Sequence, residues 1–455
     1  MPVQETNMSA TDRLVALMDH LGLGSAYFGT PIPRDISGLA TEHPERLAGI
    51  VLCVPSRLDP APFSGIDDRV LMIAGESGPA AEATARATAR LPAAQRSVLA
   101  GYDAPGSWSD AVADRTDEIA DRMIAFLDNL AANGKRPDGP GPTTAEGRQA
   151  GIAYRIEGSG PALMLLPFFL APSQWAPAIP RLARHFTVVT LGGPHLGGVA
   201  SLEDRARMPT YQAMFRTLID QIGPQLGEAI LEIGCGAGSL VRLLARRLGD
   251  ANPITGADVN PFLLREAAQL AEAEGLGELI RFTEGNAEAL PFEDHSFDCA
   301  YSVTVFEECD ADRAIAEAMR VIRPGGRVGL VVRALDMPQW WNLGLPEAIS
   351  TKVTMPPRSV APRGVADRSL YRRMRDAGLV DLVCFPTMVT LDRPGGPIWR
   401  NREDHVLSQL SPEELPIWQA ERDRAAQDGL LFMAPRCIAP SAPSRNRERD
   451  LQRDF

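Results

Sequence analysis

The sequence predicts an α/β protein in two parts, with a doubly wound parallel sheet in its C-terminal half. The chain has 455 residues, about three times the ~150 residues of a typical domain. Apolar, strand-like segments alternate with amphipathic, helix-like segments through most of the chain, which is typical of α/β folds. After residue 224, glycine-rich turns repeatedly join a strand pattern to a helix pattern, and this order favours a doubly wound sheet.

Composition excludes several classes of protein. Apolar residues at 45% and charged residues at 23% are globular values, not those of disordered or collagen-like chains. A net charge of −12 supplies no general basic field, so we expect no nucleic-acid partner. Six separated cysteines without a C-x-x-C pair predict reduced thiols and no metal site. No signal-like start or long apolar run is visible, so we expect a cytoplasmic protein without a membrane span.

Pattern divides the chain into five segments. Residues 1–133 alternate helix and strand patterns, and residues 134–147 are rich in Gly, Pro and Thr, which predicts an exposed linker. Residues 148–207 contain further strand patterns but are short for an independent domain, whereas residues 208–440 contain a long strand–helix series. The polar segment 441–455 is expected to be a disordered tail.

The N-terminal elements follow from apolar periodicity. Amphipathic DRLVALMDHLG and DEIADRMIAFLDNLAA predict helices, and apolar GIVLCV and RVLMIAG predict buried strands. Beyond the linker, IAYRIEG, ALMLLPFF and FTVVTLG predict three strands around the helical WAPAIPRLARH. These apolar strands need a sheet for burial, and we expect the two segments to share one.

Residues 11–57 resemble the middle of an α/β-hydrolase, and the segment after residue 148 resembles the beginning of that fold. The segment that resembles the beginning of the hydrolase fold thus comes later in this chain than the segment that resembles its middle. The resemblance therefore implies circularly permuted or fused hydrolase fragments. The turn that should read G-x-S-x-G is Gly29–Pro33, with Pro31 in place of the nucleophile. Pro167-Phe168 likewise replaces the usual oxyanion segment.

The other triad positions fall on Gly78 and Ala104, so we expect a non-catalytic region. Its expected role is substrate capping, scaffolding or formation of a homodimer. An active hydrolase that uses Ser25, His43 or His195 remains the alternative for this region.

The clearest motif is AILEIGCGAGSLVRLLARRL, an apolar strand that runs through Gly234, Gly236 and Gly238 into an amphipathic helix. A dinucleotide fingerprint would place its third glycine three residues after the second, but that position is Ser239. A glycine-rich turn without a ligand would also explain an isolated motif of this kind.

The motif is followed by further strand ends at regular intervals. Twenty residues after Gly238, the strand PITGADVNP ends at Asp258, where a carboxylate can accept both hydroxyls of a ribose. A turn at Gly285–Ala287 and the turn Pro324–Gly326 precede further strands. Together these elements predict a nucleoside-binding sheet edge.

From about Thr210 to Pro440 the chain resembles the class I S-adenosylmethionine-dependent methyltransferases, in particular the small-molecule group. The resemblance implies S-adenosyl-L-methionine as cofactor, with the loop at its methionine end and Asp258 at its ribose. Asn286 stands where the family commonly has Asp, and its amide oxygen can still accept a hydrogen bond. The implied cofactor-binding residues are Tyr211, Glu232, Gly234, Cys235, Gly236, Gly238, Asp258, Val259, Asn286, Ala287 and Ser302. Tyr211 has a second interpretation as an ordinary core aromatic.

Methyl transfer is an in-line displacement that positioning alone can promote. An oxygen or nitrogen acceptor benefits from a general base, for which Tyr301 and Glu307 are the candidates. We favour a different interpretation of Glu307, Glu308 and Asp310, as a solvated acidic helix start.

A Trp-, Met- and Pro-rich insertion follows the fifth strand, in the region that caps the acceptor in this family. Trp340 and Trp341 could form a flat wall, which implies a small apolar or aromatic acceptor; packing within the cap is the alternative. For the whole chain, two other functions stay open. One is a hydrolase with a regulatory nucleoside-binding domain, and the other is a non-enzymatic scaffold.

Overall fold

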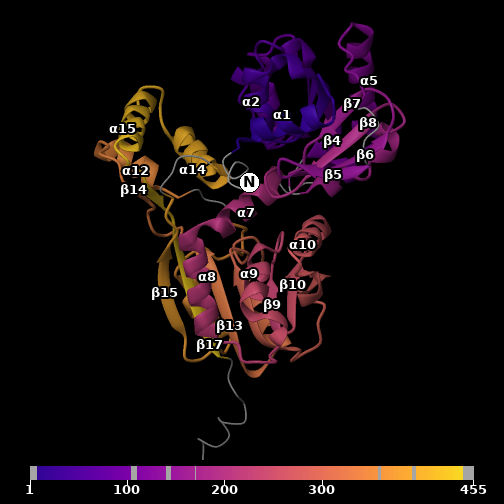
Figure 1. Ribbon diagram of the computed structural model, residues 1–455. Coiled ribbons are helices and arrows are strands. Elements are labelled where there is room, and N and C mark those ends of the chain that lie inside the picture. Colours follow the sequence, from indigo (N-terminus) through magenta and orange to yellow (C-terminus); the bar gives the residue numbers. More distant parts are fainter. Residues whose placement is uncertain are drawn as a thin grey trace, which may run out of the picture. The chain divides into compact units, whose positions relative to one another are not determined.

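The computed structural model describes residues 8–103, 110–139, 145–169, 171–356, 360–391 and 396–443. The chain forms two compact units, Met1–Ala200 and Ser201–Phe455. The division falls within helix α7 (Gly197–Arg207), whereas the sequence places it after residue 207. Both units are α/β (Figure 1), which confirms the predicted fold class.

The first unit contains an eight-stranded sheet in the order β4-β3-β2-β1-β7-β8-β6-β5. β1 pairs in parallel with both β2 and β7, so strands from both sides of the predicted linker share one sheet, as the sequence predicts. All residues of β1 and β2 are buried, as expected for central parallel strands covered on both faces. The strands are β1 Ala26–Thr30, β2 Leu47–Cys53, β3 Val70–Ser77, β4 Gln95–Asp103, β5 Glu146–Gln149, β6 Ile152–Gly158, β7 Ala162–Leu165 and β8 Thr187–Gly192.

Helices cover this sheet and supply much of its core. Helix α1 begins with a capping box, in which the Ser9 side chain accepts a hydrogen bond from the Asp12 backbone N–H. Leu14 and Leu17 of α1 and Ile36 of α2 join one apolar cluster with the strands. The helices are α1 Ala10–His20, α2 Arg34–Glu42, α3 Pro79–Thr88, α4 Ala111–Asp114, α5 Thr116–Ala132 and α6 Ile179–Leu182.

The second unit contains a seven-stranded sheet in the order β11-β10-β9-β12-β13-β17-β15. β9 lies between β10 and β12, parallel to both, so the chain order reverses direction at β9. β17 is antiparallel to both of its neighbours and runs into the first residues of the predicted tail; residues 444–455 lie outside the described ranges. The strands are β9 Ile230–Ile233, β10 Ile254–Asp258, β11 Ile280–Glu284, β12 Phe297–Val303, β13 Ile322–Arg333, β15 Val383–Met388 and β17 Arg436–Pro443.

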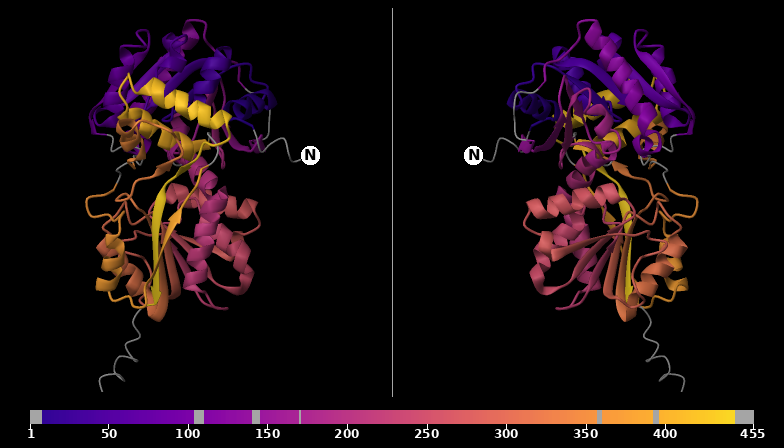
Figure 2. Two further views of the ribbon diagram at one scale, coloured as in Figure 1. Left: turned by 90° about the vertical axis from the view of Figure 1, so that its left-hand side faces the viewer. Right: turned by 90° about the vertical axis from the view of Figure 1, so that its right-hand side faces the viewer.

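Part of the second unit forms a helical cap. Helices α12, α14 and α15 gather beyond the ends of β15 and β17 (Figures 1 and 2) and have their own core around Trp341, Trp399 and Trp418. The helices of this unit are α8 Pro209–Ile222, α9 Ser239–Leu248, α10 Pro261–Ala273, α11 Ala311–Val321, α12 Glu347–Thr354, α13 Ser369–Asp376, α14 Gly396–Gln409 and α15 Leu415–Gln427, and short strands β14 Trp340–Trp341 and β16 Met433–Ala434 pair with each other.

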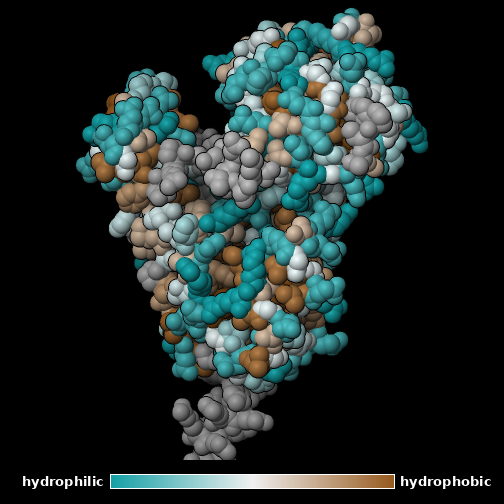
Figure 3. All heavy atoms as spheres, in the orientation of Figure 1, coloured by the Kyte–Doolittle hydropathy of each residue, from teal (hydrophilic) through white to brown (hydrophobic). Residues whose placement is uncertain are grey.

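Hydrophilic side chains cover much of the face shown in Figure 3, with apolar groups between them. Over the described ranges, no helix combines the length and the apolar character that crossing a bilayer requires.

Candidate active site

The candidate site lies where the carboxyl ends of β9, β10 and β12 meet. Because the chain moves from β9 outward to β10 and β11, and then returns to β12 on the other side, this edge is the topological switch point at which open α/β sheets bind ligands. The loop after β9 and the N-terminus of α9 (Ser239) form its centre.

The glycine loop has a backbone that only glycine adopts readily. Gly234 and Gly236 have φ angles of 74° and 55°, in the left-handed region. A Cβ on Gly234 would overlap the Val305 side chain, whereas one on Gly236 would meet only the end of Leu202, at 3.2 Å. The space beside Gly234 is therefore filled by protein, and that beside Gly236 is largely open.

Asp258 connects this loop to the end of β10. Its carboxylate accepts hydrogen bonds from the backbone N–H groups of Gly236 (2.7 Å) and Asn260 (2.9 Å). Burial raises the pKa of Asp258, while these two hydrogen bonds act in the opposite direction. Glu284, its register partner on β11, is exposed.

Glu232 and Tyr301 face each other across the switch point. The Tyr301 hydroxyl donates a 3.0 Å hydrogen bond to Glu232 Oε2, and the Glu232 side chain is 2% exposed. Burial raises the pKa of Glu232 to about 8, despite the opposing effect of that hydrogen bond. Burial and the adjacent Glu232 also raise the pKa of Tyr301 well above its ordinary value, so this hydroxyl is a poor general base.

Other predicted cofactor residues have different environments. Val259 is 64% exposed beside Asp258. Asn286 already accepts a hydrogen bond from the Glu288 backbone N–H, and its amide oxygen has a further lone pair. Ser302 is buried, and its hydroxyl donates to the Ile233 carbonyl; it therefore braces β12 against β9. Ala287 packs against a neighbouring apolar cluster.

Tyr211 and Cys235 are both buried. The Tyr211 hydroxyl has no hydrogen-bond partner among the described residues, and the Arg205 guanidinium lies over its ring at 5.0 Å. A buried hydroxyl without a partner is unusual in a core, so this observation favours a polar site over ordinary core packing for Tyr211. Burial raises the pKa of the Cys235 thiol well above its usual value.

The expectation that Glu307 is solvated is wrong. Its side chain is fully buried. Its Oε1 accepts a hydrogen bond from the Arg333 backbone N–H at 2.8 Å and also pairs with the Arg333 guanidinium at 3.4 Å, and these contacts stabilise the buried carboxylate. Within the described part of the chain, Oε2 of Glu307 is buried and has no partner. Asp310 does cap α11, as its side chain accepts the Arg313 backbone N–H.

Trp340 and Trp341, the two residues predicted to form a flat wall, have different environments. Trp341 is 9% exposed and packs edge-on against Trp399 and Trp418 inside the cap, as the packing alternative expects. Trp340, in contrast, is 51% exposed.

Sequence reasoning misses a buried arginine that supports the loop. Arg242 of α9 donates to the Ala237 carbonyl at 2.7 Å and forms ion pairs with Glu203 at 2.7 Å and Glu274 at 3.0 Å. The only hint in the sequence is a charged residue inside the apolar pattern SLVRLLARRL.

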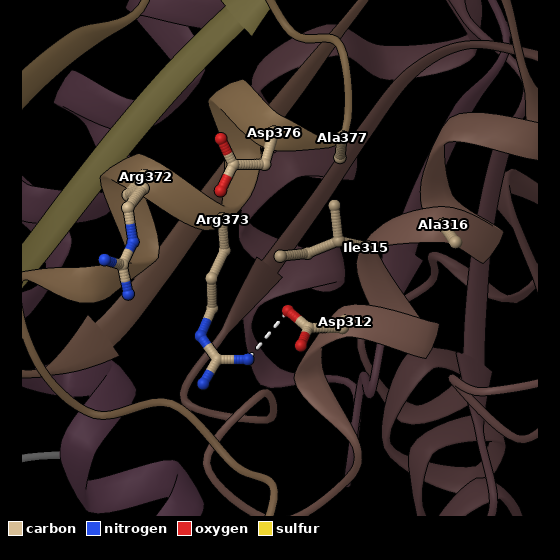
Figure 4. Close-up of a pocket in the computed structure, with 7 residues that line it drawn as sticks. All are labelled: Asp312, Ile315, Ala316, Arg372, Arg373, Asp376 and Ala377. Carbon is tan, nitrogen blue, oxygen red and sulfur yellow. Dashed lines mark ion pairs between the residues drawn. The ribbon is translucent and has the colours of Figure 1, made fainter.

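A separate charged pocket lies between α11 and α13 (Figure 4). Arg373 and Asp312 form a 2.7 Å ion pair at its centre, and the residues that line it include none of the predicted site residues. We therefore place no chemistry there.

Comparison with known proteins agrees with this geometry. Residues 231–330 match a methyltransferase domain family. A ubiquinone/menaquinone biosynthesis C-methyltransferase (UbiE) of Hahella chejuensis is 35% identical over 128 residues, which cover 28% of this chain and 51% of that protein. The UbiE protein of Shewanella halifaxensis is 33% identical over 125 residues, covering 27% and 49% respectively.

The chain thus spans about half the length of these relatives. Among solved structures, the YcgJ protein of Bacillus subtilis aligns with a TM-score of 0.36 and 20% identity, covering 51% of this chain and 99% of that one. Motif, sheet order and family match together identify a class I methyltransferase domain of the S-adenosylmethionine-dependent type within the C-terminal unit, where the family match spans residues 231–330.

Proposed function

We propose that the protein is an S-adenosylmethionine-dependent methyltransferase that acts on a small acceptor. The observation that carries this proposal is the site at the switch point, where the open glycine loop, Asp258 and Glu232 converge. Gly236 leaves room for a ligand beside its backbone, and a carboxylate at the end of β10 suits a ribose diol.

The residues of this site fit the cofactor's chemical groups, and the bound cofactor would supply the methyl group. Asp258 would hold the ribose, with Val259 and Asn286 beside the adenine, and Tyr211 and Glu232 would lie at the methionine end. Cys235, Ala287 and Ser302 would shape the site through their packing and backbone. Catalysis would then depend mainly on the alignment of the acceptor.

For the acceptor we propose a small molecule with an apolar or aromatic body, for which the exposed Trp340 ring offers a contact. Of the two candidate bases, Glu307 is favoured, because its buried Oε2 has no partner within the described ranges. Burial raises the pKa of Glu307, which makes its carboxylate a better proton acceptor.

We propose that the first unit is a non-catalytic, permuted hydrolase-like domain. If the strands are renumbered from β5, the sheet order reads 1-2-4-3-5-6-7-8, the order that an α/β-hydrolase resemblance implies. Pro31 follows the strand that would carry the nucleophile, and its ring fixes φ near −65°, which excludes the strained turn that exposes a nucleophile.

The alternative hydrolase residues do not converge. Ser25 precedes β1 and His43 precedes β2, so both lie at the amino ends of parallel strands. His195 follows β8 and lies at the opposite edge. A Ser–His pair at the carboxyl edge is therefore not formed by these residues.

Calorimetry with S-adenosylmethionine and S-adenosylhomocysteine, followed by a screen of methyl acceptors with labelled cofactor, tests this function. We expect saturable binding of both nucleosides to the full chain. A folded protein that binds neither nucleoside would contradict the proposal.

A further inference from the structure

A second polar cluster lies at the boundary between the sheet and the cap, and Arg402 is its most informative member. Arg402 lies on α14 three residues after Trp399 and four before Val406, which are 1% and 0% exposed. Residues at these spacings share one helix face, so Arg402 belongs to the face that packs against the protein.

Arg402 is a cation for which the described part of the chain supplies no compensating anion. No carboxylate among the described residues pairs with it, and the nearby charged group is a second cation, Arg333. Burial and Arg333 lower the pKa of Arg402 to about 10, whereas the exposed Arg424 has its pKa raised by its partner Glu421. A partly buried arginine that has lost water without gaining an anion is costly in the ligand-free protein.

The neighbours of Arg402 lie at the carboxyl end of β13, on the same edge of the sheet as the candidate active site. Arg333 and Cys437 are register partners on β13 and β17, so their side chains share one face of the sheet. The charges of Glu307 and Arg402 both act on the Cys437 thiol, and those of Cys437 and Glu307 also act on the Tyr211 hydroxyl. Within the described ranges, the cluster thus combines a cation that has no carboxylate partner with two buried oxygens that have no hydrogen-bond partner, on Tyr211 and Glu307.

We propose that Arg402, together with Arg333, binds an anionic group of the methyl acceptor, a carboxylate or similar oxyanion, while the reacting end of the acceptor lies toward Glu307. This inference rests on the proposed methyltransferase function and specifies its substrate class. A guanidinium fits such groups through paired N–H donors. An acceptor with an aromatic body and an acidic group could contact Trp340 with its aromatic body and Arg402 and Arg333 with its acidic group.

The test measures binding of benzoate and cinnamate, each beside its neutral amide, to the full chain saturated with S-adenosylhomocysteine. We expect the acids to bind the wild-type protein and the amides to bind at least tenfold more weakly. In Arg402→Met the acid affinity should fall at least tenfold with little change for the amides. Arg424→Met removes an exposed arginine that has a carboxylate partner, and it should bind the acids as the wild type does.

A stability measurement separates a binding role from a structural one. Because Arg402 is uncompensated without ligand, Arg402→Met should leave the thermal midpoint of the free protein unchanged or higher. If Arg402→Met does not fold, Arg402→Gln and Arg402→Lys replace it, and only the lysine variant should keep most of the acid affinity.

Three results would overturn the inference. They are acids that do not bind, acids and amides that bind equally, or an Arg402 variant with unchanged acid affinity. Nucleoside binding is measured on the same samples, so its failure would contradict the proposed function separately, and the acids would then be titrated without nucleoside.

Discussion

Each unit has a sharp turn from a central parallel strand into a helix, and the two turns have opposite chemistry. After β1, Pro31 and Pro33 are buried and the Thr30 hydroxyl accepts the Ile32 backbone N–H, so the turn is closed by its own side chains. After β9, Gly234 and Gly236 hold the turn open with left-handed backbone angles. Similar architecture therefore has a turn filled by its own side chains in one unit and an open glycine turn in the other, and function depends on the residues at such turns.

Closing the open turn should have the largest effect. Gly236→Val places a branched side chain where the cofactor would approach the backbone of the loop. The left-handed backbone angle of this residue adds a conformational cost of about 1–2 kcal/mol, which a folded domain tolerates. We expect cofactor affinity to fall by roughly a hundredfold or more, equivalent to at least ~2.7 kcal/mol, in calorimetry.

The matched control is Gly249→Val, which has a similar φ angle of 64° at the end of α9 and open space around it. This variant should bind the cofactor normally. Normal binding by a folded Gly236→Val protein would refute the assignment of the loop.

Separating the units should affect solubility in opposite ways. A chain that begins at Arg148 retains β7 but lacks its partner β1, and the exposed strand edge should cause aggregation. A chain that begins at Gly197 keeps Glu203 paired with Arg242 and should stay soluble and bind cofactor. A start at Met208 removes that buried partner and should lower the stability by several kcal/mol. Gel filtration and thermal unfolding would check all three, and a monomeric, soluble Arg148 chain would contradict the shared sheet.

Removing the strand-end carboxylate should have an intermediate effect. Asp258→Ala loses charge-assisted hydrogen bonds worth about 1.5–3 kcal/mol, so cofactor affinity should fall roughly tenfold or more. Glu284→Ala removes a carboxylate at the same register on β11 and serves as the control. Equal affinities for the two folded variants would contradict a contact between Asp258 and the cofactor.

A smaller effect concerns pH. The Glu232 carboxyl keeps its proton up to a pKa of about 8 in the folded protein, against 4.5 as its ordinary value. Its contribution to stability is therefore fully present below pH 4.5 and is lost as the pH rises through about 8. The midpoint of the wild type should fall relative to Glu232→Gln over this window in thermal scans without cofactor. A constant difference between the two proteins would contradict the raised pKa.

The last substitution, in the first unit, is expected to have no effect on esterase activity. Pro31→Ser restores a hydroxyl to the closed turn but no base or oxyanion site, so turnover of short aryl esters should remain at background. Esterase activity that appears in this variant, or that disappears from the wild type on mutation of one serine, would show that the first unit is a working hydrolase.

The sequence predicts the loop and the strand ends well, because glycine spacing and apolar strand patterns are local signals. It does not predict that Glu307 is buried, since this depends on Arg333, which β13 brings beside it. The packing of Trp341 against Trp399 and Trp418 depends on equally distant contacts. Arg402 is missed for the same reason, because its burial and its neighbours Arg333 and Cys437 depend on segments that are distant in the sequence.

The strand order of the first unit also affects its synthesis. β1 pairs with β2 and with β7, and β7 begins at Ala162, about 130 residues after the end of β1. At translation rates of about 5–20 residues per second, the free edge of β1 waits on the order of ten seconds for its partner. During that interval a strand that is central and fully buried in the folded sheet is an edge strand, so we expect folding in this strand order to require protection of the nascent chain.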